Sequence, residues 1–254
     1  MKPKGCQLRN SEIPLTRTEL LDRLVRPAVR YVRLAGCAVS GKRTLLEAFL
    51  RKSKLWARVD CSTARTLPAI IDSIASQRNL ARDESLLLKS WERARGYTLV
   101  LEHLDSADDP PATSQFVDRI RRYTAQTGRV AVTMTSHGIN PFAAAPPHET
   151  VTLFDRDLAL TKVQLDRLFE AHGWPVSHAE EVYAATGGWL ALVLSFGAML
   201  QQGPVRFGAL RGQEFEAVRR FVYDTALRGL PASTQRAAFV HRPARYLDRR
   251  PSQY

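Results

Sequence analysis

Cysteines, internal repeats and long apolar runs are scarce or missing in this chain of 254 residues. Its three cysteines form no C-x-x-C pair, which argues against a disulfide framework and favours a reducing compartment. The longest apolar run, residues 190–200, has about half of the ~20 residues that a membrane helix needs. The basic N-terminal segment lacks the apolar run of a secretory signal. We therefore expect a cytoplasmic protein with no membrane segment.

Acidic residues are outnumbered, and the formal net charge is +12. Residues 1–33 carry eight Lys/Arg against three Asp/Glu, and residues 240–254 carry four Arg against one Asp. Basic ends of this kind attract polyanions without sequence preference, and ordinary solvated ends account for the same excess. Aromatic residues do not interleave with the basic ones, and no recognition-helix motif is present. Sequence-specific DNA binding by this chain alone is not expected.

Strand and helix patterns alternate over the first part of the chain. The predicted strands are 31–35, 55–60, 97–105, 129–137 and 149–154. The predicted helices are 41–53, 67–77, 83–95 and 110–128, of which the third is capped by Asp83. This alternation implies right-handed crossovers and a parallel sheet that helices cover on both faces.

After about residue 155 the pattern becomes helical throughout. Predicted helices lie at 161–173, 177–188, 189–203 and 213–230, and no strand signal separates them. We therefore predict an α/β domain over 13–157 and an all-α domain over 158–239. A basic arm, 1–12, precedes them and a disordered basic tail, 240–254, follows them.

A phosphate-binding pattern lies at the first strand-to-helix turn. Gly36 is followed by four residues and then by Gly41 and Lys42, as in G-x-x-x-x-G-K-[ST]. In such a loop successive backbone N–H groups form a cradle for phosphate at the positive end of a helix, and the lysine reaches the β and γ phosphates. A strand before the loop and a helix after it satisfy the structural context that this motif requires.

Arg43 occupies the position where the motif requires a hydroxyl ligand for Mg²⁺. A guanidinium has no lone pair to offer and would repel the metal. Thr44 does not replace the hydroxyl, because one helical step turns a side chain by about 100°. Arg43 is instead suited to contact phosphate. Nucleotide binding is therefore expected to depend on Mg²⁺ less than usual.

The ends of the third and fourth strands also depart from the usual pattern. An NTPase needs an acid here for the metal and a second group to activate water. The chain has Glu102 and then His103, with Asp105 two residues later. Ser136 and His137, which close the fourth strand, are candidates to face the γ phosphate, although a strand end that satisfies its own backbone explains them equally well.

Six short motifs occur in the order of a known family. They are RTELLDRL (17–24), LAGCAVSGKRTLL (34–46), ARVD (57–60), LVLEHLD (99–105), VTMTSH (132–137) and ATGGWLALVLSF (185–196). This series resembles the ATPase module of MalT-type regulators in the LuxR family, which belong to the signal transduction ATPases called STAND. The resemblance covers residues 13–240. It implies a P-loop NTPase fold, with a five-stranded parallel sheet followed by an all-α helical lid domain.

The resemblance also implies a nucleotide-controlled switch. Such proteins are closed with ADP and assemble with ATP, and the helical lid would bring Leu190 near the adenine. Members continue into a winged helix, an inducer sensor and a DNA-binding helix-turn-helix. This chain departs from the family at Arg43, Glu102, His103, His137 and Leu190. It also stops where the winged helix should begin, as a truncated or frame-shifted gene product would.

Three functional hypotheses follow. In the first, the chain is a switch module that binds ATP or ADP and hydrolyses it poorly. In the second, it is a slow ATPase in which Glu102 is the metal-side acid and Asp105 or His103 positions water. In the third, it is a nucleotide-free scaffold that associates with itself or with full-length relatives. The candidate nucleotide-binding residues are Gly36, Ser40, Gly41, Lys42, Arg43, Thr44, Ser136, His137 and Leu190.

Overall fold

The computed structural model describes residues 17–36, 40–53, 55–78, 82–93, 97–123, 128–135 and 140–202. The chain divides into two compact units, of which one is Arg17–Leu158 and the other includes residues 159–202. Each unit is described by itself. The predicted arm, the helix at 213–230, the tail, Ser136 and His137 lie outside the described residues.

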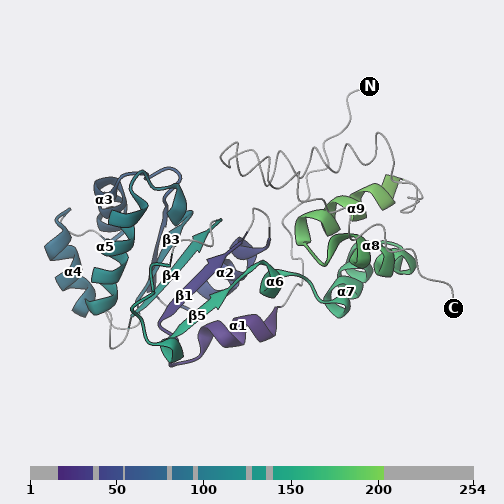
Figure 1. Ribbon diagram of the computed structural model, residues 1–254, viewed down its shortest axis with the longest axis horizontal. Helices are drawn as coiled ribbons and strands as arrows, with labels where there is room; N and C mark the ends of the chain where they lie inside the picture. Colours follow the sequence, from purple (N-terminus) through teal and green to yellow (C-terminus); the bar gives the residue numbers. More distant parts are fainter. Residues whose placement is uncertain are drawn as a thin grey trace, which may run out of the picture. The chain divides into compact units, whose positions relative to one another are not determined.

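Five strands form one sheet in the first unit (Figure 1). They are β1 (Tyr31–Ala35), β2 (Leu55–Asp60), β3 (Tyr97–Glu102), β4 (Arg129–Met134) and β5 (Thr150–Leu153). Their order is β2-β3-β4-β1-β5, and every neighbouring pair is parallel. All residues of β1 and β3 are buried, as expected for parallel strands that are covered on both faces. The predicted fold class is confirmed.

The helices of this unit lie close to their predicted positions. They are α1 (Thr18–Val25), α2 (Lys42–Leu50), α3 (Leu67–Arg78), α4 (Glu84–Arg93), α5 (Pro110–Tyr123) and α6 (Asp155–Leu158), with single 3₁₀ turns η1 (Leu104–Ser106) and η2 (Pro147–Glu149). Asp83 caps α4, since its Oδ1 accepts a hydrogen bond of 3.0 Å from the Leu86 N–H. The sequence patterns do not predict two short helices, α1 with eight residues and α6 with four.

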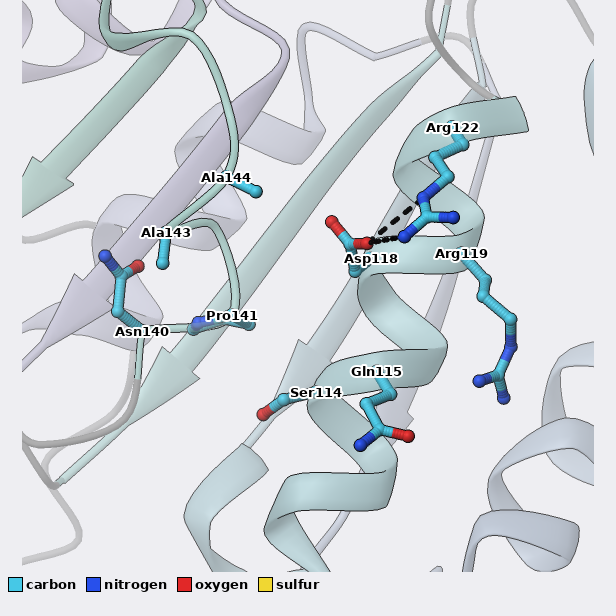
Figure 2. Close-up of a pocket in the computed structure, with 9 residues that line it drawn as sticks. All are labelled: Ser114, Gln115, Asp118, Arg119, Arg122, Asn140, Pro141, Ala143 and Ala144. Carbon is cyan, nitrogen blue, oxygen red and sulfur yellow. Dashed lines mark hydrogen bonds and ion pairs between the residues drawn. The ribbon is translucent and has the colours of Figure 1, made fainter.

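A pocket lies between α5 and the segment 140–144 (Figure 2). Ser114, Gln115 and Asp118 line it from the helix, and Asn140 and Pro141 line it from the segment. The ion pair between Asp118 and Arg122, 2.8 Å long, borders it. The pocket includes no residue of the loops that follow β1 and β3, and none of the predicted site residues lines it.

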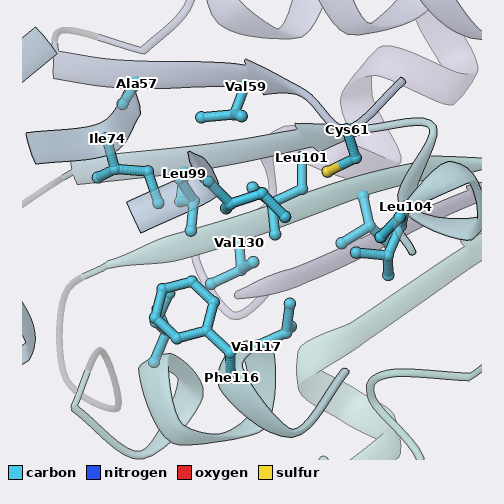
Figure 3. Close-up of a cluster of buried hydrophobic side chains, with 14 of the residues drawn as sticks. Ala57, Val59, Cys61, Ile74, Leu99, Leu101, Leu104, Phe116, Val117 and Val130 are labelled. Atoms are coloured by element: carbon cyan, nitrogen blue, oxygen red, sulfur yellow. The ribbon is translucent and has the colours of Figure 1, made fainter. Parts of the chain in front are cut away.

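Two apolar clusters fill the spaces between the sheet and its helices. The larger contains Leu99, Leu101 and Val130 from the strands, with residues of α3, α4 and α5 such as Phe116 (Figure 3). The other contains Val100 and Ala131, with residues of α1 and α2. Successive strand residues point to opposite faces, so one apolar run supplies both clusters.

The third strand is shorter than predicted. It ends at Glu102 instead of Asp105, because His103 adopts the left-handed conformation with φ of 52°. The His103 N–H donates to the Thr133 hydroxyl over 3.1 Å, and η1 follows directly. The fourth strand likewise ends at Met134, earlier than predicted.

The second unit is helical over its described residues. It contains α7 (Lys162–His172), the turn η3 (Val176–His178), α8 (Ala179–Thr186) and α9 (Leu190–Gln202) around one apolar cluster. Thr161 forms a complete capping box with Gln164 at the start of α7. Gly197 lets the Trp174 ring pack closely, because a Cβ there would lie 2.2 Å from that ring. Among the described helices, none combines the length and apolar character needed to cross a membrane.

Phe116 provides a test of the larger cluster. Phe116→Ala should lower the free energy of unfolding by about 3 to 5 kcal/mol, because the fully buried ring leaves a cavity. Urea denaturation measures the change. Tyr123→Ala, at an exposed aromatic residue of the same helix, is the control and should change stability much less. Equal losses in the two variants would contradict the placement of the core.

Candidate phosphate-binding site

The candidate site lies at the edge of the sheet where the parallel strands end. All five strands run in the same direction, so the loops that follow β1, β3 and β4 emerge at one edge. In open α/β sheets this edge is the usual position of ligands. Gly36 and Lys42 follow β1, Glu102 ends β3, and Thr135 follows β4. Residues 37–39 of the loop lie outside the described residues.

The loop after β1 turns sharply into α2. The Gly36 N–H donates to the Met134 carbonyl over 3.1 Å, so the sheet pairing continues one residue beyond β1. Gly41 adopts φ of 92°, a conformation that favours glycine, and caps the helix that begins at Lys42. Ser40 is buried beside it.

Lys42 folds back over the loop that precedes it. Its side chain is only 8% exposed. The Nζ atom donates to the Gly36 carbonyl over 2.5 Å and to the Ser40 hydroxyl over 3.4 Å. The ammonium group therefore lies inside the turn, as the phosphate-loop motif requires. The structure thus brings four of the predicted residues together: Gly36, Ser40, Gly41 and Lys42.

Arg17 is a site residue that sequence reasoning missed. Its guanidinium lies against Gly41, where an added Cβ would be 3.1 Å from Nη2. The residue is 6% exposed, and neither Nη1 nor Nη2 has a hydrogen-bond partner in the described part of the chain. Burial lowers the pKa of Arg17 to about 10, so the group stays charged at neutral pH. The only sequence signal was its place in the motif RTELLDRL.

Asp155 also contacts the loop. A Cβ on Gly36 would lie 2.3 Å from the Asp155 Oδ1 atom, so a larger residue here would force this carboxylate to move. Asp155 is the first residue of α6, the last element before the first unit ends at Leu158. Sequence reasoning assigned it no role, because nothing in the residue pattern joins positions so far apart.

Arg43 and Thr44 both lie on the exposed side of α2. The Arg43 side chain is 76% exposed, and its Nε donates to Glu47 over 3.0 Å. The structure therefore places Arg43 in a surface ion pair with Glu47, one helical turn further along α2. The sequence had predicted a phosphate contact instead. Thr44 is likewise exposed and follows Arg43 by one helical step of about 100°.

Glu102 is buried and paired with a cation. It is 7% exposed, and its Oε2 accepts a hydrogen bond from the Nε of Arg58, a residue of the neighbouring strand β2. The hydrogen bond to Glu102 raises the pKa of Arg58 above its usual value. Arg58 Nη1 also lies 3.9 Å from Glu47. Sequence reasoning predicted Glu102 as a metal-side acid and did not foresee this pairing.

His103 and Asp105 are each held by neighbouring side chains. His103 Nδ1 lies 3.0 Å from Asp60 Oδ1, at the end of β2. Burial raises the pKa of Asp60, but hydrogen bonds from Ser62 and His103 outweigh it and hold the pKa below its usual value. Asp105 Oδ2 accepts hydrogen bonds from the Thr135 N–H over 2.9 Å and its hydroxyl over 2.5 Å.

The other three predicted residues belong to other parts of the chain than the described residues of this edge. Leu190 begins α9 in the second unit and is buried in the apolar cluster there. Ser136 and His137 lie outside the described residues. The structure therefore supports the phosphate loop most directly.

Solved structures resemble the chain, whereas a scan against protein-family models and a search of curated proteins find no match. One is a signal transduction ATPase with numerous domains and a tetratricopeptide repeat sensor, from Pyrococcus horikoshii. It is 16% identical with a TM-score of 0.51, over 82% of this chain and 32% of that chain. Another is a Walker-type ATPase of Pyrococcus abyssi, 12% identical with a TM-score of 0.54, over 92% of this chain and 76% of that one.

These likenesses show the fold alone, a five-stranded parallel sheet with flanking helices. The chain spans about a third of the length of the Pyrococcus horikoshii protein. At such identities the chemistry of the site has to be argued from the residues of this chain.

The contact between Gly36 and Asp155 generates a prediction. Gly36→Ala should lower the free energy of unfolding by about 1 to 3 kcal/mol, because its Cβ would overlap the Asp155 carboxylate. Adding Asp155→Ala should recover most of that loss, and urea denaturation of the single and double variants measures the coupling. Independent, additive losses would mean that the two residues are not in contact.

Proposed function

We propose that this chain binds the phosphates of ATP or ADP at the loop 36–42 and serves as the nucleotide-binding switch module of a LuxR/MalT-type transcription regulator. One observation carries the proposal: two buried cationic side chains, Lys42 and Arg17, lie against the same glycine-rich turn at the start of a helix. The family motifs and the P-loop NTPase fold support the regulatory part.

Arg17 is the stronger argument for an anionic ligand. Removing a charge from water is costly unless a partner compensates it. The described chain supplies no hydrogen-bond partner for either Nη atom, while the guanidinium remains protonated at neutral pH. Phosphate oxygens match the planar donors of a guanidinium. A bound phosphate would therefore offset the cost of burying Arg17.

Lys42 supplies the second cation. Its Nζ is bonded to the Gly36 carbonyl and the Ser40 hydroxyl, so it is already directed into the turn. The N-terminus of α2 adds a partial positive charge at the same place. Together these groups favour a diphosphate or triphosphate over an uncharged ligand.

Hydrolysis is expected to be slow. Catalysis of phosphoryl transfer needs a metal and a group that positions water. Glu102 is bound to Arg58, His103 to Asp60, and Asp105 to Thr135. One polar atom of each of these side chains is therefore already engaged within the chain, and the bonds fix its orientation.

Lys42→Ala tests the proposed site. It should weaken ADP and ATP binding by about 10- to 100-fold, the value of one charge-assisted hydrogen bond. Calorimetric titration of the full chain measures the affinities. Lys52→Ala, at an exposed lysine just beyond α2, is the matched control and should bind like the wild type.

Multiple-turnover hydrolysis separates the alternatives. The proposal expects wild-type turnover no faster than that of Lys42→Ala. Turnover that disappears in Lys42→Ala would identify a slow ATPase instead. If the wild-type protein binds neither nucleotide, the interaction scaffold is the remaining hypothesis.

Arg17→Met separates a ligand role from a structural one. Methionine keeps the aliphatic part of the side chain and removes the unpaired buried charge, so the ligand-free protein should gain about 1 kcal/mol or more in unfolding free energy. Nucleotide affinity should fall at the same time. Urea denaturation and ADP titration of the same variant provide the two readouts. A loss of stability with unchanged affinity would show that Arg17 is only structural.

A further inference from the structure

The donor set at the phosphate loop does not fit Mg²⁺. This ion prefers near-ideal octahedral coordination by oxygen atoms. The position after Lys42 presents the guanidinium of Arg43, and the next hydroxyl, that of Thr44, is on the exposed side of the helix. Among the described residues, no group of three or more His, Cys, Asp or Glu is arranged to hold a metal ion.

Glu102 ends β3, where an NTPase usually has the acid that contacts the metal. It is already paired with a cationic side chain. Arg58 donates its Nε hydrogen to the Glu102 carboxylate, and the pair is largely buried. The strand register explains the contact. The strands β2 and β3 pair in parallel with Asp60 opposite Glu102, so Arg58, two residues before Asp60, lies on the same face of the sheet as Glu102. A divalent ion that approached Glu102 would meet the positive charge of Arg58 at short range.

Arg58 is also linked to the helix that follows the phosphate loop. Arg43 bonds Glu47 over 3.0 Å, Glu47 lies 3.9 Å from Arg58, and Arg58 is bonded to Glu102. Positively and negatively charged side chains alternate along this series, from the first turn of α2 to the end of β3. Glu47 and Glu102 are therefore both paired with arginines of the chain itself.

The geometry points to a site that takes its nucleoside phosphate without a divalent cation, with Arg58 as the residue that excludes the metal by holding Glu102. This inference rests on the proposed function and specifies its ligand as metal-free ADP or ATP. Mg²⁺ bound to a nucleotide neutralises part of the charge that attracts Arg17 and Lys42. Neither Arg43 nor the exposed Thr44 supplies a ligand that would compensate for this weaker attraction.

The first experiment compares ADP binding to the full chain in EDTA and in excess Mg²⁺ by calorimetric titration. Affinity should be equal or higher in EDTA. Binding that occurs only with Mg²⁺ would overturn this inference and leave the proposed function intact. Absence of binding in both conditions would overturn both.

Variants then test the role of Arg58. The double variant Arg43→Thr/Arg58→Ala restores the hydroxyl and releases Glu102. It should bind ADP at least about tenfold more tightly in Mg²⁺ than in EDTA, as one added metal contact would give. Arg58→Lys keeps the charge beside Glu102 and should stay independent of the metal. A double variant that remains indifferent to Mg²⁺ would refute the role of Arg58.

A control and a direct measurement complete the design. Arg65→Ala removes a different exposed arginine that pairs with Asp108, and it should match the wild type in both conditions. Circular dichroism establishes that each variant is folded. Should the double variant not fold, electron paramagnetic resonance of Mn²⁺ with wild-type protein and ADP decides the matter. The Mn²⁺ should stay in solution or on free nucleotide, and a protein-bound Mn²⁺–ADP signal would contradict the inference.

Discussion

Parallel pairing of β1 with β4 and β5 is the constraint on which the rest of the structure depends. It directs the loop after β1 and the ends of β3 and β4 to one edge of the sheet, although these segments lie far apart in the chain. Burial of the sheet on both faces keeps that edge rigid, because every strand of the central part is packed between two apolar clusters. The phosphate loop therefore starts from a fixed position, and Gly41 with its positive φ leads into α2.

The charged side chains at this edge fall into two groups, the buried cations beside the loop and the side chains at the end of β3 that are paired with residues of β2. The cations beside the loop, Lys42 and Arg17, are buried, and the guanidinium of Arg17 lacks a partner in the described chain. The acid at the end of β3 is bonded to Arg58, and His103 is bonded to Asp60. The Arg17 guanidinium beside Gly41 thus has no hydrogen-bond partner among the described residues, whereas Glu102 and His103 are each bonded to a side chain of β2. This asymmetry favours binding over turnover.

The fold could be predicted from local patterns, because apolar runs of five or six residues and helical spacing mark each element separately. The loop was predictable for the same reason, since its residues are consecutive. The partners of Glu102 and of Gly41 were not predictable. Arg58 reaches Glu102 through strand pairing across 44 positions, and Arg17 reaches Gly41 through the packing of α1. A left-handed His103 likewise ended β3 before the predicted residue. Contacts of this kind depend on the assembled sheet.

An unpaired buried guanidinium also has a consequence for stability. Apolar packing must offset the cost of holding Arg17 out of water, because its pKa of about 10 keeps it charged at neutral pH. Proteins usually break a local rule of this kind where a ligand later satisfies it. Binding an anion would then stabilise the folded state more than an ordinary surface contact, since it removes an existing cost as well as adding attraction. The loop would be least stable when empty, which is the property that a nucleotide-controlled switch requires.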